Sequence, residues 1–155
     1  MSTYPYRAEH LFTYTATLSP ETEVIPNANR VRNIVYVTGG EVWGPKVNGK
    51  VRPVGADWCH VRPDGVLVLD VRITFETDDG ALIYVQYSGT LDYGPNGYQD
   101  LLDGKAKPVS AICTTPVLET SHPDYLWLNR LTCFGIGRII PGGVRYDVYG
   151  LYSED

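Results

Sequence analysis

Long apolar runs and basic leader segments are missing from this sequence. None of its apolar stretches approaches the roughly 20 residues that span a bilayer, which argues against a transmembrane helix. The first residues, Met1 to Arg7, lack the basic segment followed by an apolar core that a secretory signal requires. A cytoplasmic location without membrane attachment is therefore the default expectation.

Cysteine and basic charge are also sparse. The three cysteines, Cys59, Cys113 and Cys133, are odd in number and far apart, which favours reduced, packed thiols over a disulfide framework. The 13 basic residues are spread singly along a chain of net charge -5, whereas a phosphate-binding surface needs them clustered. We expect no nucleic-acid partner.

Ligand sets for metals and cofactors are not apparent either. Cys59 and His60 are neighbours, so on a strand their side chains point to opposite faces. The histidines His10, His60 and His122 are too dispersed to predict a spaced ligand set. No phosphate-cradling glycine loop, dinucleotide fingerprint or nucleophile elbow occurs. The sequence therefore predicts neither a metal site nor a bound cofactor.

Glycine and proline, by contrast, punctuate the chain at short intervals. Between them lie runs rich in Val, Ile, Thr and Tyr, which pack well on a pleated surface. Strong turn signals at 47–50, 77–81 and 140–144 join three pairs of these runs as hairpins or tight reversals. We predict strands at His10–Leu18, Arg32–Thr38, Val66–Thr77, Leu82–Leu91, Val109–Glu119, Tyr125–Arg138 and Val144–Leu151, with shorter ones at Glu41–Pro45 and Asp57–Arg62.

Seven to ten strands of this kind predict an all-β fold with little helix. A closed antiparallel barrel is favoured because closure removes exposed edges, and a two-sheet sandwich is the alternative. We expect one domain over residues 10–155 after a flexible segment over 1–9. A single helical turn is predicted at Tyr98–Asp103. It lies inside a long connection, Asp92–Pro108, that is either a lid over a binding site or a plain surface loop.

The stretch 66–76 alternates apolar and polar residues, so Asp70 and Arg72 share one face of a strand. A hairpin at 78–80 would align Tyr84 and Gln86 of the next strand beside them. Facing the barrel interior, this patch would supply an acid, a cation, a phenol and an amide for proton transfer and oxyanion stabilisation. Facing solvent, it would hold only a surface ion pair.

Two further groups of residues are candidates for a site. On a strand, Tyr125, Trp127 and Asn129 would share one side, giving two aromatic plates and an amide that suit a flat organic ligand or, alternatively, ordinary packing. Asp57 precedes Trp58 after a glycine bend, an arrangement that can hold an acid against an apolar wall and raise its pKa. A turn aspartate that binds backbone N–H groups is the competing interpretation.

Several separated blocks resemble a known family. They are Gly40–Pro45, Gly55–Trp58, Arg62–Gly65, Leu69–Arg72, Thr77–Tyr84, Leu118–Thr120, Tyr125–Asn129 and Val144–Tyr149. In this order, they are similar to the family catalogued as domain of unknown function 3237, also called uncharacterised protein family 0311. The resemblance implies a compact antiparallel barrel of the calycin or lipocalin type. Members mostly lack an assigned activity, and some are linked to cofactor-free cyclisation or isomerisation.

The resemblance also implies an orientation for the polar strand face. The blocks around Asp57 and Asp70 are among the most recognisable of the family pattern, which implies that their polar groups face the barrel interior. Tyr146 and Glu119, in two other blocks, become ligand-binding candidates. The family commonly has an aromatic residue where this chain has Glu119, so the role of Glu119 is the weaker expectation.

Three functions follow as hypotheses. The first is a cofactor-independent lyase, isomerase or cyclase acting on a small, aromatic or polyketide-like molecule. Asp57 or Asp70 would carry the proton, Arg72, Tyr84 and Asn129 would polarise an oxygen, and Trp58, Tyr125 and Trp127 would form the walls. The second is a non-catalytic carrier or sensor of a small ligand. The third is a structural module that forms a homodimer or higher homo-oligomer through its aromatic residues.

Overall fold

Strands dominate the structure, a computed structural model that describes residues 3–155. The described chain contains ten strands, one short α-helix and one 3-10 helix. Their bounds are β1 Tyr6–Asn27, β2 Arg30–Trp43, β3 Gly49–Val51, β4 Ala56–Val61, β5 Val66–Thr77, β6 Leu82–Asp92, α1 Gly97–Leu102, β7 Ile112–Thr114, β8 Val117–Glu119, η1 Pro123–Arg130, β9 Thr132–Ile140 and β10 Gly143–Ser153.

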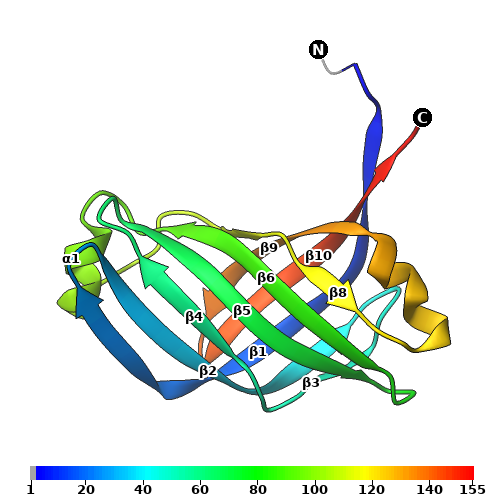
Figure 1. The fold of residues 1–155 in the computed structure, drawn as a ribbon, viewed down its shortest axis with the longest axis horizontal. Helices are drawn as coiled ribbons and strands as arrows, with labels where there is room; N and C mark the ends of the chain where they lie inside the picture. Colours follow the sequence, from blue (N-terminus) through cyan, green and yellow to red (C-terminus); the bar gives the residue numbers. More distant parts are fainter. Residues whose placement is uncertain (1–2) are drawn as a thin grey trace.

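The strands form one antiparallel sheet that closes on itself. Its order is β3-β5-β4-β2-β1-β10-β9-β7-β6-β8, and additional pairings join β5 to β6 and β3 to β2. The β5–β6 pairing returns the sheet to its starting strand, so the ring runs β5-β4-β2-β1-β10-β9-β7-β6 and back to β5. The predicted all-β barrel is therefore confirmed, and Figure 1 shows its strands winding around a common axis.

Most predicted strands and turns are present in the barrel. The hairpins β5–β6 and β9–β10 form around the turns at 77–81 and 140–144, and the helical turn at Tyr98–Asp103 corresponds to α1. β1 is much longer than predicted. It begins at Tyr6, which pairs with Ser153, and the flexibility expected of the segment 1–9 stays a prediction.

Two predicted strands are wrong in part. The stretch Val109–Glu119 is divided into β7 and β8 by Thr115 and Pro116, because proline has no N–H to donate to a ladder. Residues 123–130 form η1 instead of the beginning of a strand, with Pro123 at its first position, where a missing N–H costs nothing. Pro116 and Pro123 are the sequence signals for the two breaks, and the strand prediction followed the alternation of apolar and polar residues instead.

Five aromatic rings pack against one another in the core of the barrel. The inner face of β5 carries buried apolar residues, ending at Phe75, whose ring meets Phe12 at a centroid distance of 5.6 Å and Tyr14 at 5.1 Å. Tyr14 stacks on Tyr146 at 5.2 Å, and Tyr146 meets Tyr87 at 5.7 Å. Aliphatic side chains such as Leu67, Leu69 and Leu91 extend this core along the barrel.

The two helices lie at opposite ends of the barrel (Figure 1). At one end, η1 places Leu128 in the core with 1% of its surface exposed. At the other, α1 and its flanking loop rest on the β4–β5 turn, where Gly65 has φ +87° and any Cβ would collide with the carbonyl oxygen of Gly94. The hydroxyl of Tyr98 donates to the Asn27 carbonyl at 3.1 Å and ties α1 to the β1–β2 turn. Neither described helix has the length and apolarity that crossing a bilayer demands.

Candidate functional site

An interior cavity of about 160 Å³ occupies the α1 half of the barrel. Its walls are mostly apolar and include Val37, Leu69, Val71, Ile73, Leu91 and Val144. Asp57, Asn33, Cys59, Tyr87, Tyr93 and Tyr146 also line it, and Asp57 is the only one of the lining side chains that carries a formal charge. A larger hollow of about 540 Å³ over Glu41 and Glu76 is an open surface groove. The interior cavity is therefore the candidate site.

Asp57 reaches the cavity because of its place on β4. The neighbouring strand β2 pairs Val35 with Asp57, and β5 pairs Val71 with it, and both partners line the same cavity. Gly55 sets the entry to β4, because it has φ +96° and a Cβ there would collide with the carbonyl oxygen of Arg72. The glycine bend predicted from the sequence thus aims the carboxyl inward.

The Asp57 carboxylate accepts a hydrogen bond from the backbone of β5, at a gap in the ladder between β4 and β5. The β4–β5 ladder pairs Ala56 and Asp57, skips the next two residues, and resumes at His60. At the gap, the backbone N–H of Asp70 donates to Oδ1 of Asp57 at 3.0 Å. The carboxylate is therefore held in place by the backbone of β5, and its other oxygen is not taken up by this bond.

Burial raises the pKa of the Asp57 carboxyl to about 6, because the charged form is poorly solvated inside the barrel. The Asp70 backbone N–H and the Cys59 thiol lower this pKa, while the Asp70 charge raises it. The guanidinium of Arg32, whose Nη1 donates to the Trp58 carbonyl at 2.6 Å, lowers this pKa less than these groups do. A carboxyl with a pKa near neutrality can exchange protons in both directions at physiological pH.

Tyrosines surround this carboxyl. Burial raises the pKa of Tyr14, Tyr87 and Tyr146 well above the usual value, and the negative charge of Asp57 raises each of them further. The pKa of Tyr93 is raised in the same way, first by burial. The phenols of Tyr87, Tyr93 and Tyr146, which line the cavity, remain protonated at neutral pH, so they can donate hydrogen bonds to an oxygen on which negative charge develops.

Cys59 and Asn33 complete the polar part of the cavity. The two residues face each other across β4 and β2. The Cys59 thiol donates to the backbone carbonyl of Asn33 at 3.2 Å, and burial raises its pKa far above the ordinary range, so it is a packed thiol and not a nucleophile. Cys113, by contrast, is exposed, which the expectation of packed thiols had missed. The side-chain oxygen of Asn33 is buried without a hydrogen-bond partner.

The polar face of β5 points away from the cavity, so the predicted inward orientation is wrong. The side chains of Asp70 and Arg72 are 44% and 43% exposed and form an ion pair at 3.3 Å on the outer surface. Trp58 lies beside them, and the Cζ atom of the Arg72 guanidinium lies over the Trp58 ring, 5.6 Å from the ring centroid. The physical reason is burial: the barrel turns the wholly apolar face of β5 inward.

The neighbouring candidates lie on the same outer surface. In the predicted hairpin Gln86 lies opposite Arg72, while Tyr84 lies opposite Thr74 and Asp70 opposite Ser88. The Tyr84 hydroxyl donates to Oε1 of Gln86 at 3.4 Å. Glu119 is exposed on β8 opposite Tyr84. The predicted grouping of these side chains is real, but it faces outward. Of the predicted catalytic residues, Asp57 lines the cavity, and of the ligand-binding candidates, Tyr146 does.

The three candidates of the stretch 125–129 belong to η1, at the far end of the barrel, and do not share a strand face. Asn129 clamps the residue after β8, accepting from the Thr120 N–H and donating to the Thr120 carbonyl, both at 2.8 Å. The Trp127 indole donates to the Asp124 carbonyl at 3.1 Å. The structure therefore gives these residues contacts within the end of the barrel, and none of them lines the cavity.

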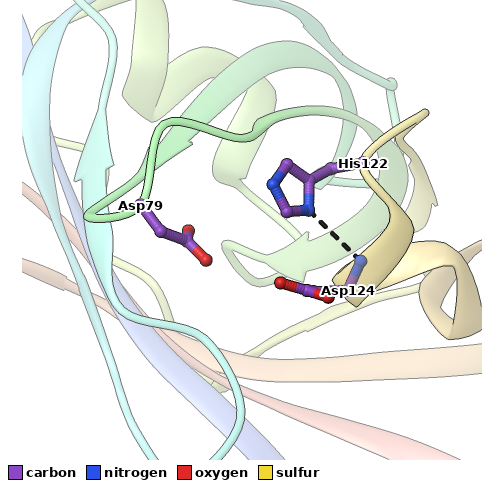
Figure 2. A group of neighbouring side chains, drawn as sticks. All are labelled: Asp79, His122 and Asp124. Atoms are coloured by element: carbon purple, nitrogen blue, oxygen red, sulfur yellow. Dashed lines mark hydrogen bonds between the residues drawn. The ribbon is translucent and has the colours of Figure 1, made fainter.

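Figure 2 shows a second polar group, in which Asp79, His122 and Asp124 converge at the start of η1. Their potential ligand atoms lie within 4.8 Å of one another. Nδ1 of His122 accepts the Asp124 N–H at 3.2 Å, so the neutral ring carries its proton on Nε2 and has no free lone pair for a metal. Both oxygens of Asp79 already accept from the Tyr125 hydroxyl, at 3.0 and 3.1 Å. The group caps η1.

The fold and the cavity together define a small antiparallel β-barrel with an interior polar site. The chain belongs to the DUF3237 family of proteins of unknown function, whose family model matches residues 6–151. The resemblance seen in the sequence blocks is therefore confirmed.

Relatives and solved structures agree with this assignment. A UPF0311 protein of Rhodopseudomonas palustris is 39% identical over 144 residues, covering 91% of this chain and 94% of its own length. A crystal structure of a conserved protein of unknown function from the same species has a TM-score of 0.83 at 33% identity and covers 97% of this chain and 100% of its own. A β-barrel-like protein of Acinetobacter baumannii has a TM-score of 0.81 at 30% identity, with coverage of 97% and 99%.

One more distant relative has a named activity. The hydroalkoxylation enzyme PhnH of Penicillium herquei is 26% identical over 132 residues, covering 84% of this chain and 74% of its own length. The likeness is well below that of the UPF0311 proteins, so it relates the chain to an enzyme without assigning the reaction.

Proposed function

We propose that this protein is a cofactor-independent enzyme that uses Asp57 as its acid and base on a small organic molecule held in the interior cavity. The observation that carries the proposal is the Asp57 carboxyl, which has a pKa of about 6, lines an apolar cavity and is surrounded by protonated phenols. A buried carboxylate costs stability, so its presence among aliphatic side chains needs a compensating use.

The relation to a hydroalkoxylation enzyme supports an addition reaction of the same chemical type. We infer addition of a hydroxyl group across a carbon–carbon double bond that is conjugated to a carbonyl. Asp57 takes the hydroxyl proton while the oxygen forms a bond to the β-carbon. The π electrons then move to the carbonyl oxygen, where phenol donors such as Tyr87 and Tyr146 stabilise the enolate. Asp57 finally returns the proton to the α-carbon, so no oxidant, reductant or metal enters the balance.

The first test is the cyclisation of 1-(2-hydroxyphenyl)but-2-en-1-one to 2-methylchroman-4-one. The protein should accelerate the reaction, give an excess of one enantiomer, and place one deuterium on the α-carbon in D2O. The rate should rise with pH through about 6, because the ionised form of Asp57 is the base. Chiral chromatography and mass spectrometry measure all three properties.

Asp57→Asn should lower the rate by roughly 100-fold or more, the usual contribution of a general acid–base group. Asp70→Asn is the matched control, because that carboxyl lies on the outer surface and is 44% exposed. Racemic product at the background rate, with the ketone bound in the cavity by NMR, would contradict catalysis of this addition. The non-catalytic ligand carrier would then be the better description.

A further inference from the structure

Asn33 is the second polar residue of the cavity, and the catalytic proposal gives it no task. The residue lies on the inner face of β2, between Val31 and Val35, where the pattern calls for an aliphatic side chain. Its Oδ1 is buried and has no hydrogen-bond partner. Such a group weakens the folded state, because its hydration is lost and nothing replaces it.

Asn33 and Asp57 are placed to hold two parts of one molecule. Asn33 pairs with Cys59 and Val35 pairs with Asp57 on the same two strands, so Asn33 and Asp57 are diagonal neighbours on one face. Diagonal neighbours in an antiparallel pair have Cα atoms about 7–8 Å apart. A ligand of ring size therefore spans the distance between the two groups.

The charge of the cavity limits the ligand further. No Lys, Arg or His is among the residues that line it, and Asp57 contributes negative charge. A carboxylate or phosphate would enter without a counter-charge, against the Asp57 field, and would lose its hydration. The volume of about 160 Å³ is close to that of engineered apolar cavities that bind benzene, which are about 150 Å³.

We propose that Asn33 is a specificity-determining residue that binds a hydroxyl group of an uncharged, ring-sized substrate. A hydroxyl both donates and accepts, so it satisfies the Asn33 amide whichever of its two ends faces the ligand. This inference rests on the proposed function for the location of the substrate in the cavity. It adds the substrate class, namely neutral hydroxyl-bearing organic molecules, and excludes organic acids.

The test compares p-cresol with toluene, which differs by the hydroxyl alone, and with the 4-methylbenzoate anion. Dissociation constants come from NMR titration of the wild-type protein and of Asn33→Leu, a variant with the same branching and the same number of side-chain heavy atoms. The ratio of p-cresol to toluene affinity should fall about tenfold in Asn33→Leu, as expected for a hydrogen bond to a buried polar group. The benzoate should bind the wild type at least about tenfold more weakly than p-cresol.

Two controls keep the outcome interpretable. Thermal unfolding of Asn33→Leu shows whether the variant folds, and Asn33→Val provides a second apolar replacement that matches the flanking residues of β2. Gln86→Leu makes a comparable change on the outer surface of β6 and should leave the affinity ratio unchanged. An unchanged ratio in both Asn33 variants would overturn the inference, and so would benzoate binding equal to that of p-cresol.

The same experiment separates this inference from the catalytic one. Asp57→Asn should keep the p-cresol preference while losing turnover. If the ratio of p-cresol to toluene affinity stays unchanged in the Asn33 variants while turnover still depends on Asp57, only the role of Asn33 is contradicted. If that ratio falls in the Asn33 variants but no turnover depends on Asp57, only the catalytic proposal is contradicted.

Discussion

At the scale of single residues, Asp57 shows a conflict between stability and chemistry. Folding raises the pKa of the Asp57 carboxyl from 3.8 to about 6, so the native state favours the protonated form more strongly than the unfolded chain does. The unfolded chain ionises this group at a lower pH than the folded one does. Ionised Asp57 therefore lowers the free energy of unfolding above about pH 6, and this loss of stability disappears as the pH falls through 6 towards 4.

Asp57→Asn should accordingly stabilise the protein at pH 7 to 8 by on the order of 1–3 kcal/mol. The amide keeps an oxygen to accept the Asp70 N–H and removes the buried charge. At pH 4 the gain should be gone, because the native carboxyl is then protonated. Urea unfolding at both pH values measures the difference, with Asp70→Asn as the exposed comparison. A stability gain that is equal at pH 4 and pH 8 would disprove the assignment of the penalty to ionisation.

Sequence reasoning at this scale singled out Asp57, which lines the cavity, but wrongly turned Asp70 and Arg72 inward. The same alternation describes a polar face turned inward or outward, and only the closed barrel decides between them. The opposite face of that strand, with Leu69 and Ile73, was already wholly apolar, and hydrophobic burial gave the correct answer. Asn33 was overlooked, although a lone amide among Val31 and Val35 was the available signal.

At the scale of elements, η1 closes one end of the barrel and stands apart from the cavity. Leu128 is 1% exposed, while Leu126, two residues earlier on the same helix, is 46% exposed. Leu128→Ala should cost roughly 2–5 kcal/mol, because it leaves a hole among core side chains that relax only partly.

Leu126→Ala should stay within about 0.5 kcal/mol of the wild type, since surface changes of this kind rarely matter. Denaturant midpoints measure both variants. Ligand binding by folded Leu128→Ala should match the wild type, because η1 does not line the cavity. Weaker p-cresol binding by that variant would show that the two ends of the barrel are coupled.

Elements with strong local signals were predictable, and those set by distant partners were not. The strand at Val66–Thr77 was predicted to the residue, because its alternation and the turn at 77–81 are both local. The stretch Tyr125–Asn129 was misjudged because its aromatic spacing suits a strand. Its folding into η1 depends on Pro123 and on the His122 cap, and its contacts include Asp79 of a turn more than forty residues away.

For the molecule as a whole, closure of the barrel is complete only over its middle. β1 pairs with β10 from Tyr6 to Thr17 and with β2 from Thr13 to Asn27, with irregularities in both ladders. Only the segment Thr13–Thr17 is therefore paired on both edges. Figure 1 shows the N-terminal part of β1 leaving the barrel beside the end of β10, while its C-terminal part runs along the barrel to the end that carries α1.

This geometry predicts three levels of protection along one strand. Amides of Thr13–Thr17 should exchange with solvent slowly, near the rate set by global unfolding, because opening them requires breaking the closed ring. Amides of Tyr6–His10 and Thr22–Asn27 should exchange much faster, since each part is held on one edge only and fraying exposes it. Hydrogen exchange followed by mass spectrometry resolves the three peptides. Equal protection across β1 would mean that its outer parts are covered by contacts beyond those of the single chain, as in a homo-oligomer.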